Sequence, residues 1–313
     1  RPEGHVRLNQ ATVDLIGEVK IGGLQHKLLA ELDQYSTKKT GDVYFTQVSS
    51  VDVYNPVLGN GPALDTSFPI PVDDHSQWTS LTLQDQVALG GGWHGVLALR
   101  HDRTEALYSL TPGTAPNKQS FTTPRVGVVW EFLPNQTLYA QYQDSIAANN
   151  GRNPADGSAL EAERARQIEF GWKQVALDGK LNTTVAVFEL VKRNRADFSL
   201  FPTVTTVGEA RSRGLEADAI GQVSPQLSLM ASYTYLDAKV TGDPLYQGLR
   251  LANTARHAGS LWGRWMFDEQ WAAGAGVFVQ GQRQGDNANS FQLPGYARVD
   301  AMTSYAFRVG SGK

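Results

Sequence analysis

The sequence contains no cysteine among its 313 residues, which excludes a disulfide framework and a cysteine-ligated zinc site. It also lacks any apolar run of about 18 residues, so no segment qualifies as a transmembrane helix. Charge is scarce: charged residues make up 19% of the chain and the net charge is −3. Without a basic surface, the composition does not predict a nucleic acid as partner.

Residue types that serve in catalysis and metal binding are present, but their spacing matches neither a catalytic site nor a metal site. The six histidines show no metal-binding spacing such as H-E-x-x-H. The 31 glycines form no phosphate-binding loop, because none of their pairs precedes a predicted helix. We therefore expect a protein that is not an enzyme and that holds no cofactor or metal site. A soluble β-rich enzyme is the least favoured alternative.

The given sequence opens on Arg1, Pro2 and Glu3, without a methionine, a basic region or an apolar segment. This start predicts either that a secretion signal has been removed or, the interpretation we favour, that the chain is an internal piece of a longer protein.

The sequence instead shows strict alternation of apolar and polar residues, the pattern typical of β-strands. Between Leu227 and Tyr235, one face reads Leu, Leu, Ala, Tyr, Tyr and the other Ser, Met, Ser, Thr. The same alternation recurs along the chain, for example at 168–173 and 297–307. It predicts about 13 strands, each apolar on one face and polar on the other.

Short turns and long loops separate these strands alternately, which is typical of an outer-membrane β-barrel. The predicted short turns lie at 22–23, 90–92, 134–135, 178–179, 224–225, 268–269 and near Gly310. The predicted loops are 36–77, 109–121, 148–163, 243–254 and 285–292, with a tighter one at 197–204. The turn spacing of about 43 residues also fits a propeller blade. A blade needs four short strands in that length, and here two long ones occupy it.

Aromatic residues gather near the short turns on the apolar face, as expected where a barrel meets lipid headgroups. This predicted girdle comprises Trp93, Trp130, Phe132, Trp172, Trp265, Phe267, Trp271, Tyr305 and Phe307. The opposite parity carries many charges, which a dry sandwich core would not accept but a wet barrel interior would. These predicted interior charges are Arg100, Arg125, Glu131, Glu169, Lys173, Glu189, Glu216, Asp218, Arg264, Arg298 and Asp300.

Several segments resemble TonB-dependent siderophore receptors, in the same order along nearly the whole chain. They are VDVYNPV (51–57), PRVGVVW (124–130), LYAQY (138–142), LEAERARQIEFG (160–171), GEARSRGLEAD (208–218), RH (256–257) and LPGYARVD (293–300). One departure is Ala162, where many members carry proline. The resemblance implies an all-β fold, an antiparallel transmembrane β-barrel of which residues 1–313 would form a part. About 13 of roughly 22 strands would be present, without the plug domain, the early strands and the final strands.

The resemblance also implies a bacterial outer-membrane receptor that imports ferric siderophores. Its partners would be the siderophore, the outer-membrane lipid, and the TonB complex acting through the plug segment absent here. Two other readings stay open: a porin-type passive channel, and a receptor for haem or cobalamin.

Ligand-binding candidates follow from the chemistry of a bulky, often anionic chelate, which aromatic rings and arginine would recognise. Six such residues lie in or beside the predicted loops: Tyr44, Tyr54, Trp78, Tyr108, Tyr246 and Arg250. The same aromatic residues would also suit an outer girdle or a solvated loop.

Overall fold

The computed structural model describes residues 4–44, 69–107, 116–148, 159–200, 203–243 and 245–307. Within these ranges the chain forms one antiparallel sheet of 13 strands in sequence order, ending with β15 beside β12. A short hairpin of β13 and β14 forms a second sheet. None of the described segments is a helix long and apolar enough to cross a membrane. The predicted all-β antiparallel fold and the number of strands in the main sheet are confirmed.

The strands are long, and most reach well beyond the five or six residues common in globular proteins. Their bounds are β1 His5–Ile21, β2 Leu24–Val43, β3 Ile70–Gly90, β4 Trp93–Leu107, β5 Asn117–Leu133, β6 Gln136–Ala147, β7 Glu163–Ala176, β8 Leu181–Leu200, β9 Thr203–Gln222, β10 Leu227–Val240, β11 His257–Met266, β12 Trp271–Gln280, β13 Arg283–Gln284, β14 Gln292–Leu293 and β15 Tyr296–Tyr305.

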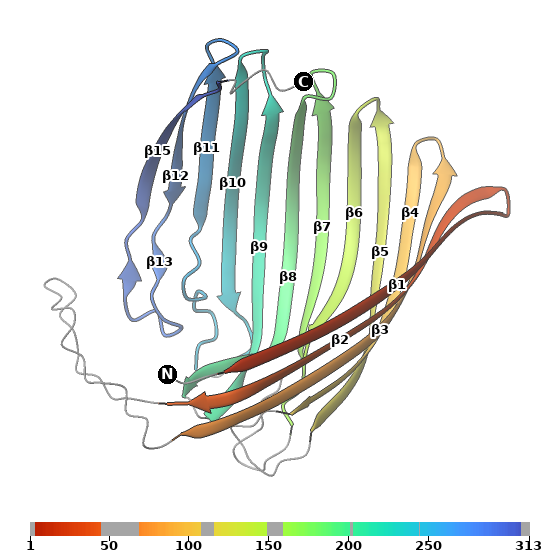
Figure 1. Cartoon of the computed structure of the whole chain (residues 1–313), viewed down its shortest axis with the longest axis vertical. Helices are drawn as coiled ribbons and strands as arrows, with labels where there is room; N and C mark the ends of the chain where they lie inside the picture. Colours follow the sequence, from red (N-terminus) through yellow and green to blue (C-terminus); the bar gives the residue numbers. More distant parts are fainter. Residues whose placement is uncertain are drawn as a thin grey trace, which may run out of the picture.

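Tight turns close the hairpins at one end of the sheet, drawn at the top and, for β1 and β2, at the right of Figure 1. Each predicted short turn within the described residues is found where expected. Gly22 and Gly23 have φ of 59° and 87°, and Asn135 and Asp178 have φ of 62° and 53°. Glycine, asparagine and aspartate tolerate this left-handed region, which explains why they occupy the turns. The turn predicted near Gly310 lies outside the described residues.

The longer connections all leave from the opposite end, at the bottom of Figure 1. The predicted loop 36–77 is wrong at both ends, because β2 continues to Val43 and β3 begins at Ile70. The two strands stay paired there, with Thr40 opposite Asp73. Likewise, β5 begins at Asn117, inside the predicted loop 109–121. The connection predicted at 197–204 is shorter than expected, because β8 continues to Leu200 and β9 begins at Thr203, and these two residues pair with each other.

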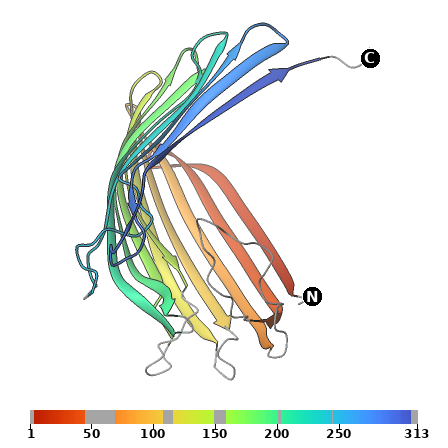
Figure 2. The same cartoon turned by 90° about the vertical axis from the view of Figure 1, so that its left-hand side faces the viewer.

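The sheet curves into an open trough, seen edge-on in Figure 2. Within the described residues its two edge strands, β1 and β15, have one neighbour each. Side chains of a strand alternate between the concave and the convex side of the trough. The register between strands therefore fixes which residues share a side.

Candidate functional site: the concave face and its loop end

The concave face, here called the lumenal face, carries the charges. Across neighbouring strands the register places Glu31 beside Thr82, Thr82 beside Arg100, and Ala98 beside Arg125. Further along the sheet, Gln141 lies beside Glu169, and Asp218 beside Ser232. All predicted interior charges except Glu189 share this face.

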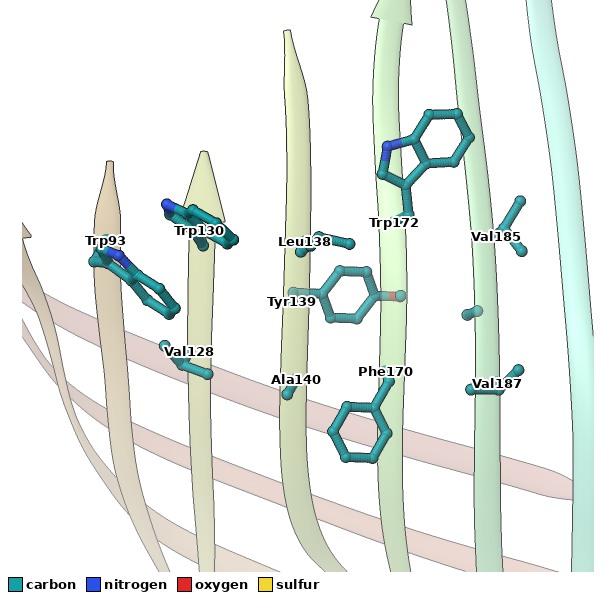
Figure 3. A pocket seen from close by; sticks show the side chains of 12 residues that line it. Trp93, Val128, Trp130, Leu138, Tyr139, Ala140, Phe170, Trp172, Val185 and Val187 are labelled. Atoms are coloured by element: carbon teal, nitrogen blue, oxygen red, sulfur yellow. The ribbon is translucent and has the colours of Figure 1, made fainter. Parts of the chain in front are cut away.

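The convex, outward face is apolar and carries the predicted girdle. Trp93 and Trp130 are opposite each other in the ladder and stack with ring centroids 5.0 Å apart and planes 7° apart. Trp271 and Tyr305 are also opposite each other, with ring centroids 4.7 Å apart and planes tilted by 41°. Figure 3 shows the Trp93 and Trp130 rings on this face, with Phe170 and Trp172 farther along the sheet and the N-terminal strands passing behind. The girdle is thus outward and close to the short turns.

An apolar groove of about 460 Å³ on the outward face is lined by the rings of Trp93, Trp130, Phe170 and Trp172. Val128, Leu138, Ala140, Val185 and Val187 contribute the rest of its apolar lining, as Figure 3 shows. The groove offers acyl chains a complementary surface but provides little polar lining that would orient a soluble ligand.

Glu189 corrects one prediction, because it lies on the outward face. It stands opposite Ile168 on one side and Arg213 on the other, and pairs with the Arg213 guanidinium. It is the first charged outward residue above Val185 and Val187 on β8. Beyond the apolar band the outward face also contacts water. A charged side chain at that level can therefore lie on either face of the sheet.

Asp102 of β4, together with Ser80 of β3, is among the most buried polar groups of the lumenal face, and its side chain is 2% exposed. The indole N–H of Trp78 donates to it at 2.6 Å, and Arg100 Nε donates at 2.9 Å. Arg100 also donates to Ser80 Oγ at 2.6 Å and lies 3.7 Å from Glu31. The cluster joins three strands, β2 to β4, beside a lumenal cavity of about 460 Å³. Trp78 is therefore a strand residue whose polar atom is already occupied, and not a loop residue.

A second lumenal cluster centres on Glu169 of β7. Its carboxylate accepts hydrogen bonds from Tyr139 Oη at 2.7 Å and from the amides of Gln141 at 3.2 Å and Gln167 at 2.7 Å. The Tyr139 ring lies across Gly171, where any larger residue would collide with it. Lys173 sits 5.1 Å above the same ring. This cluster joins β6 and β7 and leaves the carboxylate satisfied.

At the loop end of the sheet, Arg250 lies in the connection between β10 and β11, which is held by hydrogen bonds to the connection between β13 and β14. Asn289, in the connection between β13 and β14, bonds both the backbone N–H of Arg250 at 3.0 Å and its carbonyl at 2.8 Å. Asn253 N–H donates to the Gln284 carbonyl at 2.8 Å. The two connections therefore brace each other, and Arg250 is held at a fixed place.

The Arg250 guanidinium is only partly satisfied. It donates one hydrogen bond to the Thr254 carbonyl at 3.2 Å, while its buried Nε has no partner among the described residues. Burial and then the charge of Arg256 lower its pKa from the ordinary arginine value. Arginine still keeps its charge at neutral pH. A fixed cation with an unmet donor can bind an anion.

The six predicted ligand residues occupy different places. Tyr246 and Arg250 both lie in the connection between β10 and β11, Trp78 lies within β3, and Tyr44 directly follows β2. Tyr54 and Tyr108 lie outside the described residues. The sequence reasoning missed Asp102 and Asn289, the residues that organise the two sites. Asp102 shares the parity of Arg100 and could have been found, whereas the approach of Asn289 to Arg250 gives no sequence signal. The described residues contain no cluster of three or more potential metal ligands.

Comparison with known proteins agrees with this geometry. Residues 5–312 match the family model "TonB dependent receptor-like, beta-barrel". The metal-pseudopaline receptor CntO of Pseudomonas aeruginosa is 34% identical over 97% of this chain and 45% of its own length. The ferrichrome outer membrane transporter/phage receptor of Escherichia coli is 30% identical over 97% of this chain and 43% of its own length. The chain thus spans somewhat less than half of these relatives.

Solved structures show the same fold. The ferric preacinetobactin receptor BauA of Acinetobacter baumannii superposes with a TM-score of 0.83 at 21% identity, covering 98% of this chain and 48% of that one. The ferric-catecholate import receptor Fiu of E. coli gives 0.79 at 17% identity, covering 98% and 49%. At such identities the likeness concerns the fold alone. Taken with the family match, the outward apolar girdle and the wet lumenal face, it shows that this chain belongs to the β-barrel of the TonB-dependent receptors, transport proteins of the bacterial outer membrane.

Proposed function

We propose that this chain forms part of the barrel wall of a receptor that imports ferric siderophores, driven by TonB through a plug segment. The observation that carries the proposal is the fixed, incompletely satisfied Arg250 at the loop end of a charged lumenal face. This cation would bind an anionic chelate that arrives from outside. Tyr246 lies in the same connection and adds an aromatic surface.

The names of the relatives support this class of substrate, because they include receptors for ferrichrome and for a metal–pseudopaline chelate. The second of these favours another candidate, a metal chelate of the pseudopaline type, because that relative is 34% identical to this chain. Tyr44, Tyr54, Trp78 and Tyr108 remain candidate contacts. For Trp78 the contact would be through the ring, because its N–H is used by Asp102.

The binding site is tested in the full-length receptor with a panel of ferric chelates. Arg250→Ala should weaken binding of the transported chelate by about 1–3 kcal/mol, the range for a lost charged hydrogen bond. Lys180→Ala is the matched control, since it removes one positive charge at the short-turn end. Unchanged affinity after replacing Tyr54, Tyr246 and Arg250 together would remove the proposed site.

Energy coupling is tested by growth and uptake in cells. With the receptor as sole uptake route, growth on the ferric chelate should stop when TonB is deleted. Growth that continues without TonB indicates the alternative of a passive porin-type channel. Uptake of haem or cobalamin, with no ferric chelate taken up, would replace the substrate but keep the family mechanism.

A further inference from the structure

An ion pair lies inside the apolar band of the outward face, on β2 and β3. His26 Nδ1 lies 2.8 and 3.0 Å from the two carboxylate oxygens of Asp85. Asp85 shares the outward face with Leu97, its partner in the ladder, and His26 shares it with Val87. The other outward residues of β3 at this level are all apolar: Leu81, Leu83, Val87 and Leu89. The pair therefore faces hydrocarbon, where ionisable groups are rare and mark functional contacts.

The pair leaves polar atoms without a partner. His26 uses only Nδ1, and its Nε2 makes no hydrogen bond within the described part of the chain. The Asp85 carboxylate accepts from His26 alone among the described residues, although a carboxylate has about four acceptor positions. The side chains are 13% and 35% exposed, so a molecule outside the barrel can reach them. Acyl chains cannot form hydrogen bonds, so lipid leaves these atoms unsatisfied.

Asp85 also lines an apolar groove of about 600 Å³ that crosses the neighbouring strands β1 to β4 (Figure 1), here called the β1–β4 groove. Gly17 and Ala30 are the smallest residues of its lining, and a Cβ at Gly17 would meet nothing within 4 Å. Five leucines supply most of the remaining apolar surface: Leu15, Leu28, Leu83, Leu97 and Leu99. Small residues let two membrane proteins approach closely. The groove thus offers a protein partner an apolar contact beside the unsatisfied polar atoms.

A second copy of the receptor satisfies both requirements. Two copies related by a two-fold axis along the membrane normal present the same residues at the same depth. A protonated imidazole donates from both nitrogens, so each His26 can donate from Nε2 to Asp85 of the second copy. The two pairs then close a ring of four alternating charges, and leucines of each copy pack in the groove of the other. We propose that the β1–β4 groove and its His26–Asp85 pair form a contact between two copies of the receptor in the membrane. This contact does not depend on which ligand the receptor carries.

The test uses the full-length receptor in intact outer membranes. The 313 residues contain no cysteine, so Leu97→Cys places a single thiol of this segment in the groove. Phe170→Cys on β7 is the matched control, since Phe170 is 57% exposed on the outward face and Leu97 is 60% exposed. With a short bismaleimide, we expect Leu97→Cys to give a product of twice the receptor mass, at least about ten-fold more abundant than with the control.

A second variant tests the ion pair itself. His26→Leu with Asp85→Leu, combined with Leu97→Cys, should still fold, because apolar residues commonly replace an ion pair in apolar surroundings without loss of stability. We expect its yield of the double-mass product to fall about ten-fold. An unchanged yield would overturn the role of the pair.

Two results with the unaltered pair would overturn the contact between copies, whether or not the leucine variant folds. One is equal cross-linking of Leu97→Cys and Phe170→Cys, which would leave the groove to acyl chains. The other is a cross-linked product that contains a different protein, which would assign the groove to that partner.

Discussion

At the scale of single residues, which side of the sheet a side chain occupies determines what its replacement does. Ala231 is outward on β10, opposite Leu261, whereas Ser232 is lumenal and bonds Ser260 Oγ at 2.8 Å. A charge placed on the outward face must be taken into lipid, and one placed on the lumenal face stays in water.

Ala231→Arg should therefore destabilise the full-length receptor by about 2–4 kcal/mol when it folds into lipid vesicles. Ser232→Arg should be much milder, since Asp218 lies directly opposite and can accept the guanidinium. Denaturant titration of both variants measures the difference. Equal losses of folding free energy would contradict the assignment of the two faces.

Trp78→Phe tests the buried lumenal cluster. The phenyl ring keeps the apolar contact but removes the hydrogen bond to Asp102, whose carboxylate is nearly inaccessible to water. We expect a loss of about 1–3 kcal/mol of unfolding free energy, because a buried acceptor loses one partner. Trp130→Phe is the control, because it changes the same residue type on the outward face, and its effect should be smaller. If the two variants are equally stable, the hydrogen bond is not a structural anchor.

At the scale of strands, the sequence predicts what lies within the membrane better than what lies above it. Between Leu227 and Tyr235 one face meets lipid and the other water, and this contrast produces the alternation. At Thr37 to Val43 and Ile70 to His75 both faces are wet, so the alternation disappears although Thr40 and Asp73 remain paired. The prediction of a loop at 36–77 failed there for that reason. Glu189 was misplaced by the same effect, and the docking of Asn289 on Arg250 depends on distant chain segments.

The lengths of the connections at the two ends of the strands also predict which end lies outside the cell. In outer-membrane barrels the short turns are periplasmic and the long connections extracellular. Protease added to intact cells that carry the full-length receptor should therefore cut between Val43 and Ile70. It should spare the turns at Asp178–Gly179 and Asp268–Glu269, which are drawn at the opposite end in Figure 1. Mass spectrometry of the released peptides locates the cuts, and cleavage at those two turns would reverse the topology.

At the scale of the molecule, the open trough has two edges with unused backbone groups. β1 has 17 residues and β15 has 10, and each pairs along one side within the described residues. Lipid cannot satisfy a free N–H or C=O, so an open edge is not stable in a membrane. We propose that further strands and a plug complete the barrel.

The 313-residue chain expressed alone should accordingly fail to form a stable barrel. On refolding into detergent we expect none of the heat-dependent shift in gel mobility that a closed barrel gives, whereas the full-length receptor should show it. Adding the complementary strands as a second chain is the control and should restore the shift. A shift by the isolated chain would mean that β1 and β15 can meet.

Several of the strands are also longer than the thickness of the membrane requires. A strand crosses the bilayer in about 9–11 residues, while β3 has 21 and β8 and β9 have 20 each. At about 3.3 Å per residue, β3 runs for roughly 70 Å, and about half of that length stands clear of the hydrocarbon. The receptor therefore raises a collar of hydrogen-bonded backbone above the cell surface. Antibodies and other large molecules would meet the rim of this collar well before they could reach the lipid.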